Sequence, residues 1–366
     1  MSAPAGRGSA PGSTARRLRG SRTQRRASPM NPALASRTHG DEQDVLSATL
    51  RQIRGSAASL EDWSAQPLTK HGKQRVVRYD LRARRAPGSD VFWLQWVGKF
   101  YENDRAARRV AAVLRQLAGG DGGAGEGGVE VPRVLAYDAS RRLLLLTYET
   151  GESVVSAIAH HRGPVVPAIG RALAALHGTP VTLDAITSPA DVLADLRPRV
   201  VDLCARFPGH AGVLRSALTR LEHDAPAARA VPSFVHGDCG TANLLWRPGC
   251  LVVLDFDRCT RGDPAADLGY LLTQLRRVTV RKPGKLPELA SVRSAILDEY
   301  RRWSSPDPGL GRRVAWYEQA TLVSKIHVLA FDRTRHPEAD ARRQRQVEAI
   351  ELLRCLANAR DSDRSS

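Results

Sequence analysis

The distribution of apolar residues predicts strands and helices in different parts of the chain. Residues 75–81 (RVVRYDL) and 91–97 (VFWLQWV) are rich in aromatic and β-branched side chains, and turn residues precede each run. This composition predicts two strands of a small antiparallel sheet. Apolar residues at helical spacing predict helices over 41–62 and 103–117, and Asn103 is the expected N-cap of the second helix.

After one more predicted buried strand at 141–148, the pattern predicts mostly helices. A strand-loop-strand block at 234–256 interrupts them. We therefore predict an α+β fold with an extension at 1–40, a small sheet-containing half at 41–148 and a larger, mostly helical half at 149–360. In the larger half, helices are predicted over 168–177, much of 190–224, 265–278, 288–303, 311–331 and 339–358.

Composition excludes several classes of protein. Of the 366 residues, 42% are hydrophobic and 25% are charged, which is ordinary for a soluble globular protein. The apolar runs, such as Leu143 to Leu146, are far shorter than the ~18 residues of a membrane span, so we expect no membrane partner. The five cysteines form no CxxC pair, which argues against a disulfide scaffold or a zinc ribbon. A reducing, cytoplasmic location is the simplest prediction.

Positive charge is concentrated at the N-terminus. The formal net charge is +17, and residues 1–40 contain eight arginines with no lysine or acidic residue. Their Ser, Gly, Ala and Pro content predicts disorder. Three interpretations are open. The extension is a segment without a role, translated only if Met1 rather than Met30 is the start, or it is a weak binder of polyanions such as nucleic acid. The third is a targeting peptide, which the lack of an apolar stretch disfavours.

Residues that can carry chemistry gather in the block 234–257. Two apolar runs there are flanked by acidic groups, and the turn 247–250 between them predicts a hairpin. That pairing brings Asn243 and Asp255 to one end of the hairpin, with Asp238 on the loop leading in. Mg²⁺ takes carboxylate and amide oxygens when phosphate oxygens complete its shell. A further carboxylate can orient a hydroxyl nucleophile or accept its proton.

The spacing of this block matches a kinase pattern. His236-x-Asp238-x-x-x-x-Asn243 fits the catalytic-loop pattern H-x-D-x-x-x-x-N, and Asp255 stands where the DFG aspartate would be. Gly237 replaces the arginine of protein kinases, and the sequence GDPAADL follows downstream. With these features the chain resembles the aminoglycoside phosphotransferase and choline kinase-like family.

The resemblance implies a bilobal, protein-kinase-like fold, with a nucleotide-binding N-lobe and a C-lobe for catalysis and acceptor binding. It implies ATP and Mg²⁺ as cofactors and a small-molecule hydroxyl compound as acceptor. Asp238 corresponds to the catalytic base, and Asn243 and Asp255 correspond to the magnesium ligands. His236 corresponds to a residue that shapes the loop, and Asp267 to a buried acceptor that steadies it.

The expected phosphate clamp departs from the family pattern. Lys99 follows the strand at 91–97 and resembles the lysine that neutralises nucleotide phosphates, although a lone lysine at a strand end is often only a solvated charge. The usual partner is a glutamate on the next helix, and the helix expected from Asn103 contains none. Glu102 or Asp104 would have to substitute, or the lysine is held in another way.

Two further segments complete the expected nucleotide site. Thr147 and Tyr148 lie in a run that resembles the inter-lobe connector, where backbone groups would bind an adenine edge; ATP rather than GTP is the family default. No GxGxxG sequence occurs, and residues 69–75 (TKHGKQR) are the candidate cover for the phosphates.

Structural roles compete with chemical ones at several positions. His236 is expected to be a structural histidine rather than a proton carrier. Asp263 and Asp267 would cap the helix that starts near Pro264 if they have no chemical role. Asp257 is either a second acid near the metal or a turn residue.

The acceptor side is basic. Residues 270–366 contain 19 Lys and Arg against 12 Asp and Glu, which argues against a polycationic aminoglycoside and for a neutral or anionic hydroxyl compound. Trp303, Trp316 and Tyr317 would stack on a ring of the acceptor, or else pack in the core.

The leading hypothesis is therefore an ATP- and Mg²⁺-dependent small-molecule kinase. A catalytically inactive, nucleotide-binding module that regulates a partner is the alternative, motivated by the missing helix glutamate. A third is a polyanion-binding protein led by the arginine-rich extension. The acceptor and the oligomeric state do not follow from the sequence.

Overall fold

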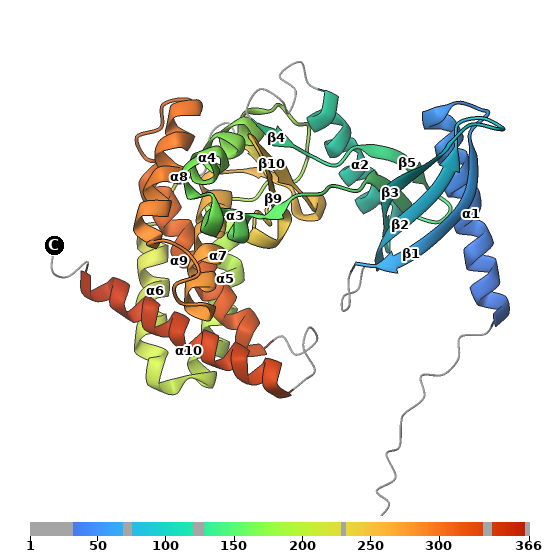
Figure 1. The fold of residues 1–366 in the computed structure, drawn as a ribbon. Helices are drawn as coiled ribbons and strands as arrows, with labels where there is room; N and C mark the ends of the chain where they lie inside the picture. The colour runs from blue at the N-terminus through green and yellow to red at the C-terminus, as the bar shows by residue number, and fades with distance from the viewer. Residues whose placement is uncertain (1–31, 69–74, 120–127, 228–231, 332–338, 363–366) are drawn as a thin grey trace, which may run out of the picture. The chain divides into compact units, whose positions relative to one another are not determined.

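The computed structural model describes residues 32–68, 75–119, 128–227, 232–331 and 339–362 (Figure 1). Contacts divide the chain after Leu46 into two units, 1–46 and 47–366. Helix α1 (Pro32–Arg54) crosses this boundary. Most of the predicted extension at 1–40 and most of the predicted phosphate cover at 69–75 lie outside the described residues.

A five-stranded antiparallel sheet forms the first part of the larger unit. Its order is β1-β2-β3-β6-β5 (Figure 1). Alternate residues of β2 are buried because strand side chains point to opposite faces, and α2 (Asp104–Gly119) follows β3. Asn103 caps α2, since its Oδ1 accepts from the Ala106 amide at 2.8 Å. The strands are β1 (Ser59–Pro67), β2 (Arg75–Arg84), β3 (Val91–Phe100), β5 (Val134–Asp138) and β6 (Leu143–Thr147).

The predicted helix over 41–62 is wrong at its C-terminal end. The helix ends at Arg54, and Gly55 follows with φ of +102°, which favours glycine. Residues 59–62 belong to β1 instead. This strand is at the sheet edge and is mostly polar and exposed, so it carries no apolar pattern by which the sequence could predict it.

A second, smaller sheet carries the predicted hairpin. Its order is β4-β10-β9-β7, and β9 pairs antiparallel with β10 across the turn 247–250. The apolar residues at the start of the block, in β8, do not belong to this hairpin, because β8 pairs with β11 instead. The strands are β4 (Val129–Glu130), β7 (Glu152–Ser153), β8 (Ser233–Val235), β9 (Leu244–Arg247), β10 (Cys250–Val253) and β11 (Thr260–Gly262).

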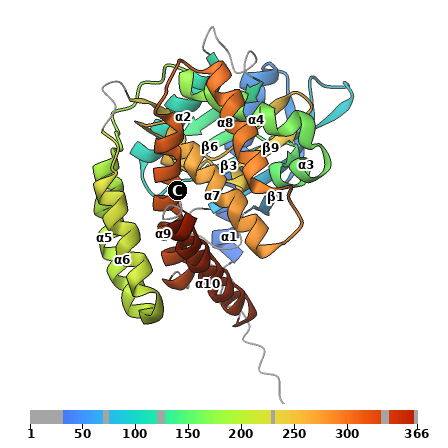
Figure 2. The same ribbon diagram turned by 90° about the vertical axis from the view of Figure 1, so that its left-hand side faces the viewer.

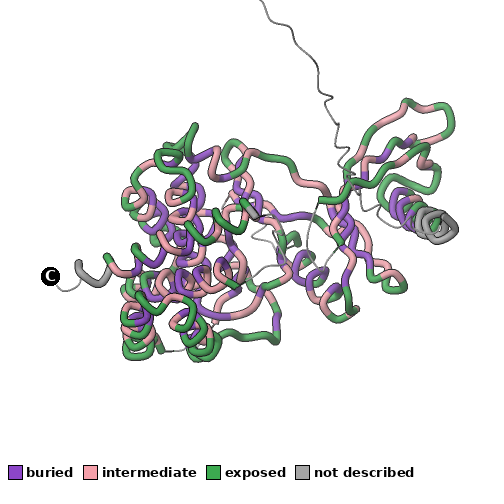
Figure 3. Tube along the Cα trace, turned by 90° about the horizontal axis from the view of Figure 1, so that it is seen from below, coloured by how far each residue is buried: buried purple, intermediate pink, exposed green. Residues whose placement is uncertain are grey.

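Helices make up most of the remaining chain, as predicted. In Figure 2, α5 and α6 lie side by side, and their residues contact each other. Helix α4 packs so closely on α8 that a Cβ on Gly170 would lie 2.3 Å from the Ile296 carbonyl oxygen, so only glycine fits there. Buried positions concentrate where helices face one another (Figure 3). The helices are α3 (Val154–His160), α4 (Arg162–Gly178), α5 (Pro189–Arg206), α6 (Ala211–His223), α7 (Ala265–Arg281), α8 (Leu289–Trp303), α9 (Leu310–Phe331) and α10 (Ala339–Ser362).

Among the described residues, no helix combines the length and the apolar character that a bilayer crossing requires. We predicted a boundary between two lobes near residue 148. The contacts group residues 47–366 into one compact unit and do not divide the chain there, so this boundary stays a prediction.

Candidate active site

The loop 236–243 leaves β8 through a backbone conformation that requires glycine. Gly237 has φ of +77°, and a Cβ on it would lie 2.3 Å from the Arg258 carbonyl oxygen. Any side chain at this position would meet both backbone strain and a clash. The glycine that replaces the kinase arginine therefore lets the loop pass close to the segment after β10.

A buried carboxylate holds this turn in place. Asp267, in the first turn of α7, accepts from the amides of His236 at 2.6 Å and Gly237 at 2.9 Å. His177 Nε2 lies 3.0 Å from the same carboxylate. Burial raises the pKa of Asp267, but the hydrogen bond and charge of His177 outweigh it and leave the pKa below its usual value. The carboxylate of Asp263, by contrast, bonds the start of the helix through the Ala265 amide at 3.1 Å.

His236 is structural in this loop. The ring is fully buried, its Nε2 donates to the Leu254 carbonyl oxygen at 2.9 Å, and its Nδ1 accepts from the Asp238 amide at 3.2 Å. Since both ring nitrogens are engaged with backbone, the imidazole ties the loop to the end of β10. This is the role that the sequence favoured over proton transfer.

The hairpin brings together the three residues predicted to act at the site. The Asn243 side-chain nitrogen donates to the Asp238 carbonyl oxygen at 2.9 Å, and the Leu254 amide donates to the Asn243 carbonyl oxygen at 2.8 Å. Asp255 follows directly with φ of +64°, an uncommon left-handed conformation for a non-glycine residue. That turn ends the strand and leaves the Asp255 carboxylate partly exposed.

Lys99 reaches this site from β3. The Lys99 ammonium nitrogen lies 2.8 Å from the Asp255 carboxylate and 2.9 Å from that of Asp257. Tyr101 donates to Asp257 at 2.8 Å, and Arg109 of α2 donates to the Asp257 carbonyl oxygen at 2.6 Å. Burial raises the pKa of Asp255, yet the Lys99 charge and hydrogen bond more than offset this and leave the pKa lowered.

The partner of the lysine is therefore neither of the two acids considered from the sequence. Glu102 is exposed, and Asp104 accepts from Tyr137 and from Arg108 of its own helix. Asp257 takes the place of the helix glutamate from another part of the chain. It is more than a turn residue, although it lies in a short 3₁₀ turn (Phe256–Arg258).

The backbone amides of Thr147 and Tyr148, predicted to lie at an adenine edge, are hydrogen-bonded to other parts of the chain. The Thr147 amide donates to the Arg133 carbonyl oxygen at 3.0 Å, and the Tyr148 amide donates to that of Gln95 at 3.3 Å. The end of β6 is thus paired on both sides by neighbouring backbone. Base binding through their carbonyl groups stays a prediction.

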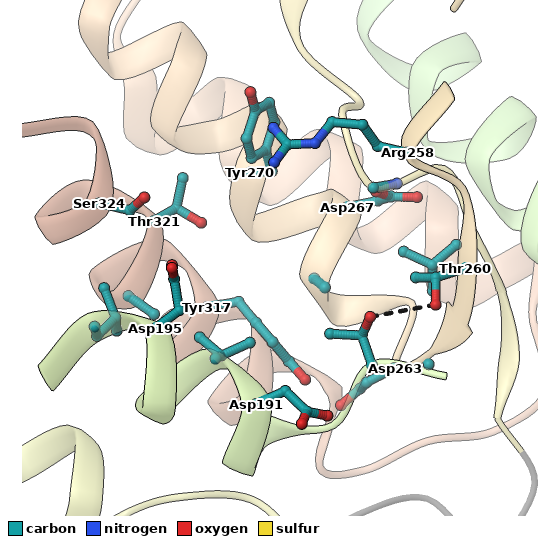
Figure 4. A pocket seen from close by; sticks show the side chains of 18 of the residues that line it. Asp191, Asp195, Arg258, Thr260, Asp263, Asp267, Tyr270, Tyr317, Thr321 and Ser324 are labelled. Atoms are coloured by element: carbon teal, nitrogen blue, oxygen red, sulfur yellow. Dashed lines mark hydrogen bonds between the residues drawn. The ribbon is translucent and has the colours of Figure 1, made fainter. Parts of the chain in front are cut away.

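A cavity of about 330 Å³ opens beside Gly237 of the loop (Figure 4). The Tyr270 hydroxyl of α7 donates to Asp238 Oδ1, and Lys325 of α9 donates to the Tyr270 hydroxyl at 2.6 Å. The Lys325 ammonium also lies 4.3 Å from the centre of the Tyr270 ring. The sequence offered no signal for Tyr270 or Lys325, because they come from two helices that only packing brings together.

The three aromatic residues that were candidates for stacking on the acceptor lie in different environments. Trp316 is buried and donates to the Leu221 carbonyl oxygen at 2.9 Å, so it belongs to the core. Tyr317 is also buried but lines the cavity (Figure 4). Trp303 is 52% exposed and donates to Glu299 at 2.9 Å.

The donor set fits a hard divalent cation that shares its shell with phosphate. Asp255 and Asp257 bring two carboxylates that face the Lys99 ammonium, and the Arg109 guanidinium donates to the Asp257 backbone. Asn243 adds a neutral amide oxygen, to which no described residue donates a hydrogen bond. Carboxylate and amide oxygens suit Mg²⁺. In the described part of the chain, no three His, Cys, Asp or Glu side chains cluster as a complete metal site, so phosphate oxygens and water would have to complete the shell.

Comparison with known proteins identifies the family and the fold of this chain. Residues 83–316 match the Phosphotransferase enzyme family, and no curated protein sequence matches the chain significantly. The crystal structure of aminoglycoside phosphotransferase APH(4)-Ia is similar with 13% identity and a TM-score of 0.54, covering 88% of this chain and 99% of that one. A choline/ethanolamine kinase family protein from Mesorhizobium loti is similar with 18% identity and a TM-score of 0.51, covering 86% and 94%. The chain therefore belongs to the phosphotransferase enzyme family and has the protein-kinase-like fold.

Proposed function

We propose that this protein transfers the γ-phosphoryl group of ATP to a hydroxyl group of a small molecule. The observation that carries the proposal is the convergence of Asp238 and Asn243 of the loop 236–243, Asp255 after β10 and Lys99 of β3. A similar solved structure, a variant of APH(4)-Ia, is a ternary complex with ADP and hygromycin B. That complex supports a nucleotide and a small molecule as the two ligands of this protein.

Asp238 is the proposed catalytic base. Its Oδ1 accepts from Tyr270, which fixes the carboxylate and leaves Oδ2 to accept from the acceptor hydroxyl. The hydroxyl oxygen forms the new bond to the γ-phosphorus as the bond to the β–γ bridging oxygen breaks. The hydroxyl proton passes to Asp238, and ADP is the leaving group.

Asn243 and Asp255 are the proposed ligands of Mg²⁺, and Lys99 contacts the nucleotide phosphates. When bound, Mg²⁺ neutralises phosphate charge that would otherwise repel the two carboxylates beside Lys99. The hypothesis of an inactive module depended on the missing helix glutamate. Because Asp257 supplies a carboxylate to Lys99 at 2.9 Å, that reason no longer favours it.

The test is a screen of hydroxylated compounds in which ADP release from Mg·ATP is measured. We expect turnover with at least one class of acceptor, and Asp238→Asn should lower kcat by about 10²- to 10⁴-fold, the usual contribution of a general base. The control is Glu348→Gln, a buried acid that pairs with Arg277 of α7 at 2.7 Å and lies outside the site. Turnover by Asp238→Asn at the wild-type rate would refute the assignment.

A further inference from the structure

The inner end of the cavity places two cations around the residue that holds the proposed base. Tyr270 lies between Asp238 and Lys325 in a chain of hydrogen bonds. Arg258 also lines the cavity, and its side chain is drawn beside the Tyr270 ring in Figure 4. Burial raises the pKa of Tyr270, as does the charge of Asp238, and the nearby Arg258 charge acts in the opposite direction. Lys325 is thus linked through Tyr270 to the carboxylate at which the acceptor hydroxyl has to bind, and Arg258 lines the same cavity.

The cavity also has acidic residues, but the two deepest are compensated within the protein. Asp267 accepts from two backbone amides and contacts His177. Asp263, with a side chain only 3% exposed, pairs with the Arg313 guanidinium at 2.7 Å. A buried carboxylate that is already matched by a cation attracts a further cationic ligand only weakly.

The two remaining acids lie on α5, on a different wall (Figure 4). Asp191 is engaged in the capping box of that helix with Ser188. Asp195 pairs with Arg199 at 2.8 Å, and Arg199 also donates to Ser324 on the facing helix. The α5 carboxylates are thus held by their own surroundings, whereas Arg258 has no ion-pair partner among the residues that the structure describes.

We propose that the acceptor carries an anionic group, a carboxylate or a phosphate, next to the hydroxyl that is phosphorylated, and that Arg258 and Lys325 bind this group. The inference rests on the proposed function, because it assumes that the acceptor hydroxyl binds at Asp238. An ammonium group at the same place would meet two like charges at short range, which opposes binding of polyamines in that orientation.

Lys325 serves as a charge and not as a proton carrier in this arrangement. A protonated ammonium has no lone pair and cannot accept the proton that Tyr270 would release. Proton transfer from Tyr270 therefore cannot continue through Lys325, and what Lys325 brings to the cavity is positive charge beside the phenol.

The same cations could instead contact the phosphoryl group in transfer. The two roles differ in which substrates they affect. Cations that bind an anionic substituent matter only for acceptors that carry one. Cations that stabilise the transferred phosphoryl group matter for every acceptor equally.

The experiment compares matched pairs of alcohols, such as glycerate with glycerol and gluconate with glucitol, together with a polyamine such as kanamycin. Binding is measured by calorimetry on the full chain with Mg·ADP present, so that free anions do not occupy the nucleotide site. ADP release from Mg·ATP is measured separately. The variants are Arg258→Gln and Lys325→Met, and Arg312→Gln, an exposed arginine on the same helix as Lys325, is the control.

We expect an anionic member to bind more tightly than its neutral partner. Each of the two variants should weaken the anionic member roughly tenfold or more, as loss of a charge-assisted hydrogen bond does, and should leave the neutral member within about twofold. Arg312→Gln should change neither. Charge-selective binding without ADP release would contradict the proposed function; it would show that Arg258 and Lys325 form an anion site, but not that its ligand is a phosphoryl acceptor.

Three results would overturn the inference. The first is tighter binding of the polyamine than of any anionic alcohol. The second is an equal loss for anionic and neutral members in Arg258→Gln and Lys325→Met, which would assign both cations to the phosphoryl group. The third is the absence of binding by every anionic member of the panel.

Discussion

Replacing Asp267 by asparagine tests whether one buried carboxylate holds the catalytic loop in shape. The side chain is 1% exposed, and both of its oxygens accept hydrogen bonds. Asparagine keeps the volume but turns one oxygen into an NH₂ group, which cannot accept. At least one of the amides of His236 and Gly237 then loses its partner, and the contact with the His177 ring weakens.

The expected destabilisation follows from the number of donors affected. A buried donor left without an acceptor costs about 1–3 kcal/mol. One amide and part of the His177 contact together predict a loss of about 2–4 kcal/mol in the free energy of unfolding. Because the loop also positions Asp238, binding of Mg·ATP and acceptor turnover should fall with it.

The assay is denaturant unfolding of the wild type and of Asp267→Asn, with Glu348→Gln as a control for the loss of a buried acid elsewhere. The control should lose stability while its catalytic-loop signals, observed by NMR, stay at wild-type positions. A loss of less than about 1 kcal/mol in Asp267→Asn would refute the reasoning, since one orphaned amide alone should cost that much.

The pH dependence supplies an independent check on the same residue. Because the pKa of Asp267 is lower in the folded chain than its unfolded value, the ionised carboxylate adds stability that is present above the unfolded pKa of about 4. That contribution is lost as the pH falls through the folded pKa. The wild type should therefore lose stability more steeply than Asp267→Asn below about pH 4, and parallel curves would contradict this.

Three further predictions concern neighbouring positions. Gly237→Ala and Gly249→Ala both place alanine at a φ near +78°, but only the alanine at 237 meets a backbone atom, the Arg258 carbonyl oxygen at 2.3 Å. Thermal unfolding should show a stability loss of about 1 kcal/mol for Gly249→Ala and a clearly larger loss for Gly237→Ala. Equal losses would contradict the close approach of the two backbone segments. Lys99→Met removes the only cation paired with the Asp255 carboxylate among the described residues and should weaken Mg·ATP binding about tenfold or more by calorimetry; unchanged affinity would argue against the phosphate clamp. Cys239 is fully buried, and burial raises its thiol pKa well above the usual value. A maleimide should therefore label Cys239 only after unfolding. Fast labelling of the folded chain would contradict this and show that the loop opens.

Local signals in the sequence were enough for much of the site. The turn 247–250 lies between two short apolar runs, so the hairpin and the approach of Asn243 to Asp255 follow from contacts that are close in the chain. Helices of the second half were predictable for the same reason, since their signals are local: α5, α6, α7 and α8 show an apolar period over many residues, and α4 has a helix-favouring composition. The edge strand β1 was not predictable, because a mostly exposed strand has no such period.

Tertiary structure alone decided which residues pair when they are far apart in the sequence. Lys99 meets Asp257 across 158 positions of the chain, and Tyr270 meets Lys325 across 55. No repeat or spacing encodes such pairs, because they depend on how a sheet and several helices pack after each has formed. The sequence by itself determined the loop 236–243, its hairpin and most helices, whose hydrogen bonds join residues that are near in the chain. The charges that surround the proposed base and the lysine were set by packing, since burial and charge compensation arise only when distant segments meet.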